Sequence, residues 1–193
     1  MNGLRSLGEQ LTARFLSILQ PQAARADGDV REAANRQAER LLDDYGDRIL
    51  RLAYSYLQNR EDAEEILQDT LVQFLKTAPT LESREHEKAW LLRVAANLSK
   101  NRLKYNALRR TDQLAEELVS EDREDLSFVW EAVKALPLAY REVIHLFYQE
   151  GYSTGEIAGL LGQREATIRS RLARGREKLK AILGEAYDFD EKV

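Results

Sequence analysis

Residues 153–180 read STGEIAGLLGQREATIRSRLARGREKLK, and this stretch decides the C-terminal half of the fold. Ser153 and Glu156 have the spacing of a capping box, which starts a helix at a defined residue. Gly162 is the residue type that closes such a short helix in the left-handed conformation. A second, longer helix is expected over residues 165–183. Two helices joined by about four residues form a helix-turn-helix.

The longer helix is expected to have one buried face and one DNA-binding face. Its inward stripe and that of the shorter helix predict the local core: Ile157, Ala158, Leu161, Ile168, Leu172, Gly175 and Leu179. The outward residues are mostly small, which lets a backbone approach the major groove, and cations flank them. Seven residues of this helix are therefore predicted to bind DNA: Thr167, Arg169, Ser170, Arg171, Arg174, Arg176 and Lys178. A structural helical hairpin with a solvated basic face is the alternative.

Positive charge is concentrated on two segments of a chain whose formal net charge is −4. Residues 93–110 carry six Lys or Arg and no acid, and residues 163–180 carry seven against two acids. Between them, residues 111–126 hold seven acids against one Arg. Basic helices on an acidic chain indicate two contacts to a phosphate backbone. For either segment alone, a solvated surface explains the charge equally well.

The composition predicts an all-α protein. The 193 residues include only 10 Gly and 3 Pro, and Leu, Ala, Glu and Arg dominate. No window alternates apolar and polar residues long enough to predict a sheet. The absence of cysteine excludes disulfides and thiolate metal sites and fits a reducing, cytoplasmic location. No apolar run predicts a membrane span, no signal peptide is recognisable, and no cofactor or metal is expected.

Two small helical domains joined by an acidic linker are expected, the second containing the helix-turn-helix. The predicted boundaries are an N-terminal extension at 1–28, a first domain at 29–110, a linker at 111–125 and a second domain at 126–193. The extension has an amphipathic helical stripe over residues 3–19. This stripe is expected to pack on the protein's own body, with a partner protein or a membrane surface as alternatives.

Three helices are expected in the first domain: one over residues 30–57, one that is capped by Asn59 and runs to residue 77, and one over residues 88–109, with a loop at 78–87. On the second of these helices, Glu65, Asp69 and Val72 lie opposite the predicted buried face. An apolar residue is thus predicted to be exposed among acids.

Five short motifs, in this order and spacing, resemble the bacterial sigma factors of the extracytoplasmic-function (ECF) group. The resemblance covers residues 40–183, about three quarters of the chain. The motifs are EDAEEILQDT at 61–70, AWLLRVAANL at 89–98, LPLAYREVI at 136–144, GYSTGEIA at 151–158 and TIRSRL at 167–172. Each is moderately specific alone, and their common order is much more specific.

The resemblance implies a sigma factor that binds core RNA polymerase and directs promoter-specific transcription initiation. The first domain would be sigma region 2, which binds the polymerase and the minus-ten promoter element, and the second would be region 4, which reads the minus-thirty-five element. The resemblance assigns polymerase binding to Glu65, Gln68, Asp69 and Val72. It assigns binding of the melted promoter strand and its upstream duplex to Arg93, Lys100, Arg102 and Lys104. Core RNA polymerase and promoter DNA are the implied partners, and an anti-sigma factor is a conceivable one.

Two other functions are weighed against this interpretation. A stand-alone helix-turn-helix regulator would share the DNA-reading helix without replacing the sigma subunit, and a two-fold dimer on palindromic half-sites would support it. An enzyme is not expected, because no paired nucleophile, phosphate loop or metal-ligand spacing is present. His86 and His145 are the only histidines.

Overall fold

The computed structural model describes residues 28–77, 79–109 and 127–186, and the account below concerns these residues. Every regular element in this part of the chain is a helix, which confirms the predicted all-α class. The predicted amphipathic helix at 3–19 and the acidic linker at 111–125 lie outside it. No helix within the described ranges combines the length and apolar character needed to cross a membrane.

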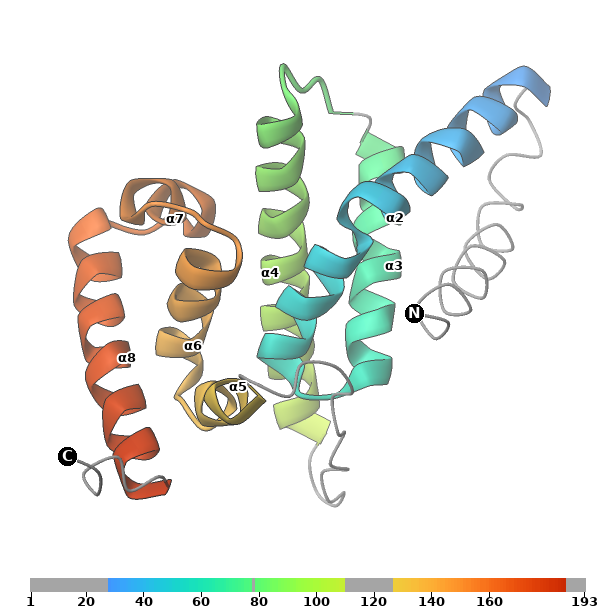
Figure 1. The fold of residues 1–193 in the computed structure, drawn as a ribbon. Coiled ribbons are helices and arrows are strands. Elements are labelled where there is room, and N and C mark those ends of the chain that lie inside the picture. Colours follow the sequence, from blue (N-terminus) through green and yellow to red (C-terminus); the bar gives the residue numbers. More distant parts are fainter. Residues whose placement is uncertain (1–27, 78, 110–126, 187–193) are drawn as a thin grey trace.

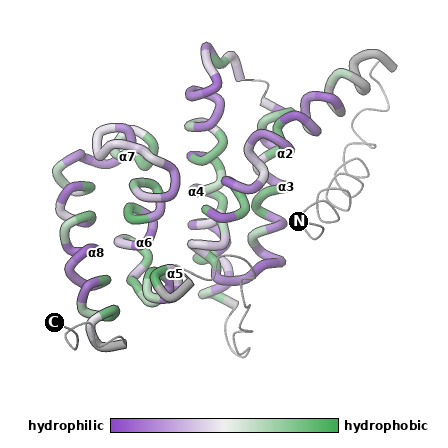
Figure 2. Tube along the Cα trace, in the orientation of Figure 1, coloured by the Kyte–Doolittle hydropathy of each residue, from purple (hydrophilic) through white to green (hydrophobic). Residues whose placement is uncertain are grey.

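The N-terminal bundle consists of three long helices: α2 (Gly28–Leu57), α3 (Arg60–Thr77) and α4 (Arg84–Arg109). Figure 1 shows α3 and α4 side by side, with α2 crossing them. Apolar residues at helical spacing on each helix meet in a buried core, whose largest members include Leu41, Ile49, Leu52, Tyr56, Ile66, Leu91 and Leu92. In Figure 2 the hydrophilic residues gather on the outward sides of these helices. The core sets which face of each helix remains available for binding.

The starts of α3 and α4 are both fixed by side-chain caps. The Asn59 side chain accepts a hydrogen bond from the backbone N–H of Asp62 at 2.8 Å, as its position predicts. Helix α4 begins at Arg84, whereas the sequence predicted a start at residue 88. The Ser83 hydroxyl accepts from the N–H of His86 at 3.1 Å, and acids in the first turn favour an earlier start. The predicted loop at 78–87 is therefore shorter than expected.

The C-terminal bundle contains α5 (Ser127–Lys134), α6 (Leu138–Ile144), η1 (His145–Gln149), α7 (Thr154–Leu161) and α8 (Glu165–Ala186). Helix α6 packs along α8, and α7 closes one end of the pair (Figure 1). Gly175 permits the close approach of α6 and α8, since a Cβ there would lie 3.2 Å from Cγ1 of Ile144. A larger side chain at this position would push the two helices apart.

The segment from Leu138 to Gln149 is not one regular α-helix, because its second part is π-helical. The N–H of Glu150 donates to the carbonyl of His145 at 3.2 Å, five residues back. A π-turn holds one more residue than an α-turn and so shifts the buried face. As a result His145 and Leu146 are buried, while Tyr148 is 57% exposed.

The helix-turn-helix has the predicted caps. Ser153 and Glu156 form a complete capping box, in which the N–H of Ser153 donates to the Glu156 carboxylate at 2.8 Å. Gly162 ends α7 with a φ of 64°, the left-handed conformation expected there. Leu160 is buried, whereas Leu161, predicted to face inward, is half-buried. Helix α7 starts at Thr154, and α8 runs to Ala186, slightly beyond its predicted end.

Ser153→Ala is expected to lower the free energy of unfolding by about 1 kcal/mol, because the N–H of Glu156 loses its side-chain acceptor. Ser153→Gly should cost only a few tenths of a kcal/mol, since water can reach the same donor. Thermal or denaturant unfolding of both variants measures the difference. An unchanged stability of Ser153→Ala would show that the hydroxyl does not act as a cap.

Candidate nucleic-acid interface

A groove of about 630 Å³ lies between the start of α6 and one side of α8. The side of α8 that lines it carries Ala166, Thr167, Ser170, Arg171, Arg174 and Lys178. Pro137, Ala139 and Tyr140 form the opposite wall. The structure thus brings five of the seven predicted DNA-binding residues of this helix onto one concave surface. The hydroxyls and cations of this surface can contact base edges and phosphates together.

The other two predicted DNA-binding residues, Arg169 and Arg176, do not line this groove and are held in place by neighbours. Arg169 donates to the Glu165 carboxylate at 2.7 Å, and this pair, together with the Thr154 hydroxyl, holds the pKa of Glu165 below its usual value. The guanidinium of Arg176 lies 5.3 Å from the ring centre of Phe147 and 5.5 Å from that of Tyr148. These contacts restrict the rotamers of both arginines, which lowers the entropy lost when they bind a phosphate.

The four predicted DNA-binding cations of α4 do not form one open basic face. Arg93 donates to the carbonyl of Gly159 at 3.0 Å, and Lys100 lies 3.0 Å from the Glu142 carboxylate. The remaining two differ: Arg102 pairs with Asp62 and Glu65, and Lys104 is exposed. Three of the four cations are therefore already bound to acceptors within the protein.

The surface of α3 predicted to bind a partner is narrower than the sequence suggested. Glu65 and Asp69 are exposed, as predicted. Gln68 is only 9% exposed, and Val72 is half-buried against the core, so their predicted outward positions are wrong. Both lie on the side of α3 that also carries Leu75, which packs against the core. The exposed strip therefore keeps the acids Glu65 and Asp69 but lacks an exposed apolar residue.

Two acids that the sequence analysis did not single out join the bundles. Glu142, 3% exposed, accepts from the hydroxyl of Tyr56 at 2.6 Å. Glu150, whose side chain is 0% exposed, lies 2.9 Å from the guanidinium of Arg48 and 3.2 Å from the amine of Lys88. The only feature of the sequence that could indicate their role is an acid within an otherwise apolar helical stretch. This feature does not identify the residues that the acid contacts.

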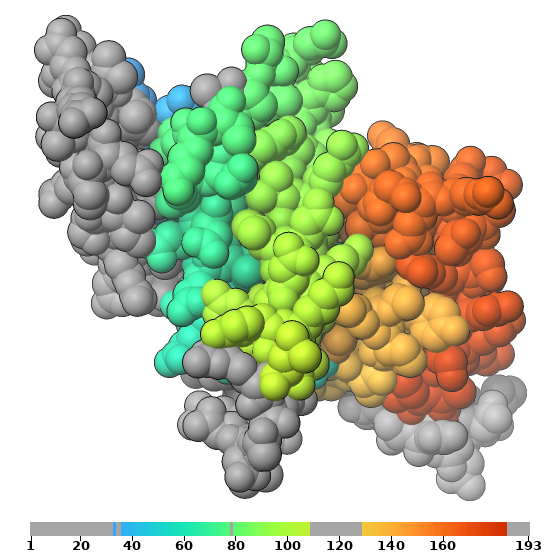
Figure 3. Space-filling view, turned by 180° about the vertical axis from the view of Figure 1, so that it is seen from behind, coloured from blue at the N-terminus to red at the C-terminus, as the bar shows by residue number. Residues whose placement is uncertain are grey.

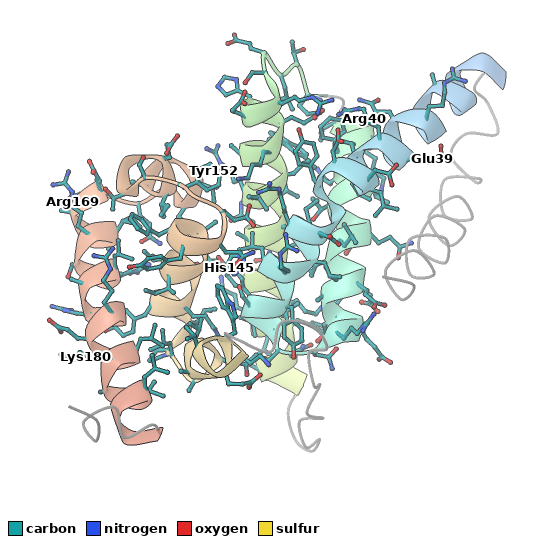
Figure 4. The ribbon with its side chains drawn as sticks, in the orientation of Figure 1. Glu39, Arg40, His145, Tyr152, Arg169 and Lys180 are labelled. Carbon is teal, nitrogen blue, oxygen red and sulfur yellow. The ribbon has the colours of Figure 1, made fainter. Side chains whose placement is uncertain are left out.

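The contact between the bundles, called the seam below, extends beyond these acids. Figure 3 shows α4 packed directly against the C-terminal bundle, and α2 and α4 contact α6 and α7 respectively. The Lys88 amine lies 4.5 Å over the ring of Tyr152. Figure 4 shows His145 and Tyr152 on the side of the C-terminal bundle that faces α4. Burial lowers the pKa of His145 to about 4, so its imidazole is neutral at pH 7.

Comparison with known protein families identifies both bundles. A family model described as Sigma-70 region 2 matches residues 41–110, and one described as Sigma-70, region 4 matches residues 129–179. Together they cover more than half of the chain. The matched ranges contain α3, α4, α7 and most of α8.

Curated relatives agree with the family matches. The chain is 29% identical to the ECF RNA polymerase sigma factor SigE of Mycolicibacterium smegmatis, over 82% of this chain and 65% of that protein. It is 30% identical to the ECF RNA polymerase sigma factor SigM of Mycobacterium tuberculosis, over 69% of this chain and 70% of the relative. It is 28% identical to the RNA polymerase sigma factor SigV of Bacillus subtilis, over 74% of this chain and 88% of the relative.

A solved structure shares the arrangement of helices. The sigma factor RpoE from Bartonella quintana, in complex with the anti-sigma factor NepR, superposes with a TM-score of 0.62 and 26% identity. The match covers 76% of this chain and 96% of that one. The family matches, the relatives and the fold therefore agree that this chain belongs to the sigma-70 family, among the sigma factors of the ECF group.

Proposed function

We propose that this protein binds core RNA polymerase and directs it to promoters through two DNA contacts, one on each bundle. The groove on α8 is the observation that carries the proposal. It gathers Thr167, Ser170, Arg171, Arg174 and Lys178 on one surface of a capped helix-turn-helix. A helix presented in this way fits the major groove and contacts base edges and phosphates. The C-terminal bundle would read the minus-thirty-five element.

The N-terminal bundle has two further proposed roles. The exposed acidic strip of α3, with Glu65 and Asp69, would contact the polymerase. The cations Arg93, Lys100, Arg102 and Lys104 on α4 would hold the minus-ten region. Arg102 pairs with Glu65, so the polymerase contact and the DNA contact share an ion pair. Gln68 and Val72 contribute less to this surface than the sequence implied, because little of either is exposed.

An anti-sigma factor is a further proposed partner. The similar sigma factor RpoE is seen in complex with the anti-sigma factor NepR. The present chain has the same two bundles, so it offers comparable helical surfaces for such a protein.

The direct test is transcription in vitro with core polymerase, the purified protein and a library of promoter sequences. The proposal expects specific transcripts that require both core polymerase and this protein, with selected sequences near both promoter elements. A stand-alone regulator would act only on polymerase that already carries another sigma subunit. Absence of transcripts with core polymerase, together with an effect on holoenzyme, would replace the proposal by that alternative.

Asp69→Arg is expected to weaken binding to core polymerase about tenfold or more, because a like charge placed in a complementary interface costs on the order of several kcal/mol. Asp69 is exposed on α3, so the fold should be retained. Asp47→Arg is the matched control, since Asp47 is an exposed residue of α2 that pairs only weakly with Arg51, at 3.9 Å. Fluorescence anisotropy with labelled protein measures the affinity. Equal affinities for the two variants would remove α3 from the interface.

A further inference from the structure

Helix α8 begins with an acid, although the residues that it is proposed to present to DNA are cations and hydroxyls. Glu165 is the first residue of α8 and the acid of its first turn. In a helix-turn-helix, the N-terminal residues of the second helix contact base edges in the major groove. Ala166, next to Glu165, is exposed and small, so this turn can approach DNA closely. In the proposed complex, Glu165 would therefore lie near base edges.

The Glu165 carboxylate is held in one orientation by three donors that all reach the same oxygen. Oε1 accepts from the Thr154 hydroxyl at 2.8 Å, and from Nη2 and Nε of Arg169 at 2.7 and 3.1 Å. The hydrogen bonds from Arg169 and Thr154 hold the pKa of Glu165 below its usual value, so the group is ionised at pH 7. The side chain is thus an oriented anion rather than a freely rotating surface group.

The other oxygen of this carboxylate, Oε2, makes no hydrogen bond to any residue that the structure describes. A carboxylate has about four acceptor positions on its two oxygens, so Oε2 keeps its capacity to accept. The side chain of Glu165 is 41% exposed, which allows a donor from a ligand to reach it. Figure 4 shows the paired Arg169 near the start of α8, on the outward side of the helix. Glu165 therefore offers one oriented and accessible acceptor.

DNA offers few partners to such an acceptor. Phosphate oxygens repel a carboxylate, so Glu165 cannot strengthen binding to the backbone. In the major groove the hydrogen-bond donors are the exocyclic amines of cytosine and adenine. Adenine carries the acceptor N7 beside its amine, and this atom repels a carboxylate, whereas cytosine presents its amine alone. A carboxylate at this position is therefore best matched to cytosine.

We propose that Glu165 is a specificity-determining residue whose Oε2 accepts a hydrogen bond from the exocyclic amine of one cytosine in the upstream promoter element. Arg169 and Thr154 are positioning residues that hold the carboxylate for this contact. The inference rests on the proposed function, which places α8 in the major groove, and it adds a base preference to that function. Glu165 also disfavours sequences that lack the amine, because its charge then faces the DNA without a donor.

The test is a selection from a promoter pool that is randomised over the upstream element, with core polymerase bound to the full chain. The parental protein should select cytosine at one position. Glu165→Gln should shift the preference at that position towards adenine, because an amide offers a donor and an acceptor that match N7 and the amine of adenine. The preference for cytosine over adenine should fall about tenfold or more.

Glu177→Gln is the matched control, since it removes the same charge from an exposed acid about three turns farther along α8. Both variants lose repulsion towards phosphates and should bind DNA more tightly, but only Glu165→Gln should change the selected base. If Glu165→Gln fails to fold by circular dichroism, Thr154→Val takes its place. This variant removes the orienting hydroxyl and should lower the preference for cytosine severalfold.

An unchanged preference at every position in the folded Glu165→Gln variant, or in Thr154→Val if it takes its place, would overturn the inference. Glu165 would then only connect α7 to α8. A parental element without a selected cytosine would also overturn it. Failure of the parental protein to select any upstream element with core polymerase is a separate result, which would refute the proposed function and the inference that rests on it.

Discussion

Ile168→Ala is expected to lower the free energy of unfolding of the C-terminal bundle by about 2–5 kcal/mol. Ile168 is 0% exposed and lies on the inward face of α8, in the core that also contains Ile157, Leu146 and Leu172. Removing three carbon atoms there loses their transfer free energy and leaves a cavity that the short helices α6 and α7 cannot close easily. The loss would displace α8 and reduce DNA recognition indirectly.

The measurement can be confined to the affected bundle because each bundle contains one of the two tryptophans, Trp90 and Trp130. In a Trp90→Phe background, the fluorescence of Trp130 reports denaturant unfolding of the C-terminal bundle. Ala173→Ser, at an exposed position of the same helix, is the control and should change stability by less than about 0.5 kcal/mol. A loss below about 1 kcal/mol for Ile168→Ala would mean that this part of the core is loosely packed.

Arg174→Ala is expected to reduce the affinity for a selected upstream promoter element by about 1–3 kcal/mol and to relax the preference at one position. Arg174 is exposed and lines the groove on α8. Arg171→Ala should also relax the preference at one position, but its side chain is partly occupied by Glu142. The net loss for Arg171→Ala should therefore be smaller when it is measured on the free protein.

Lys178→Ala provides the contrast, since Lys178 is exposed and lies about two turns beyond Ser170 along α8. It should weaken binding about equally on all sequences and make the salt dependence shallower by roughly one released counterion. Selection from a randomised promoter pool with each variant distinguishes the two behaviours. A parental upstream preference at normal strength in both Arg171→Ala and Arg174→Ala would show that another element reads the DNA.

The features that could be predicted from the sequence are local ones. The capping box at Ser153 and Glu156, the left-handed Gly162 and the cap at Asn59 each depend on residues within one turn. The inward stripe of α8 depends only on helical periodicity, and Ile168 and Leu172 are buried as that periodicity predicts. The groove residues of α8 follow from the same periodicity, because they lie along one flank of that stripe and on the side opposite it.

The features that could not be predicted depend on distant residues. Tyr56 and Glu142 are 86 positions apart, so no local pattern indicates their hydrogen bond. The same holds for the ion pair between Lys100 and Glu142, because the sequence pattern around Lys100 indicates only DNA binding. The burial of Gln68 was missed because a helical wheel treats one helix at a time. The real exposed strip of α3 depends on how its neighbours cover it.

The π-turn at His145–Gln149 has a consequence for how this helix tolerates insertions and deletions. A π-turn is equivalent to an α-helix with one inserted residue. Deleting one residue there would restore regular α-helical hydrogen bonding and keep the downstream residues in place, whereas a regular α-helix of the present length would rotate them by about 100° around the helix axis. Glu150 would then turn away from Arg48 and Lys88. The length of this turn, rather than the identity of its side chains, thus sets the register between the two halves of the molecule.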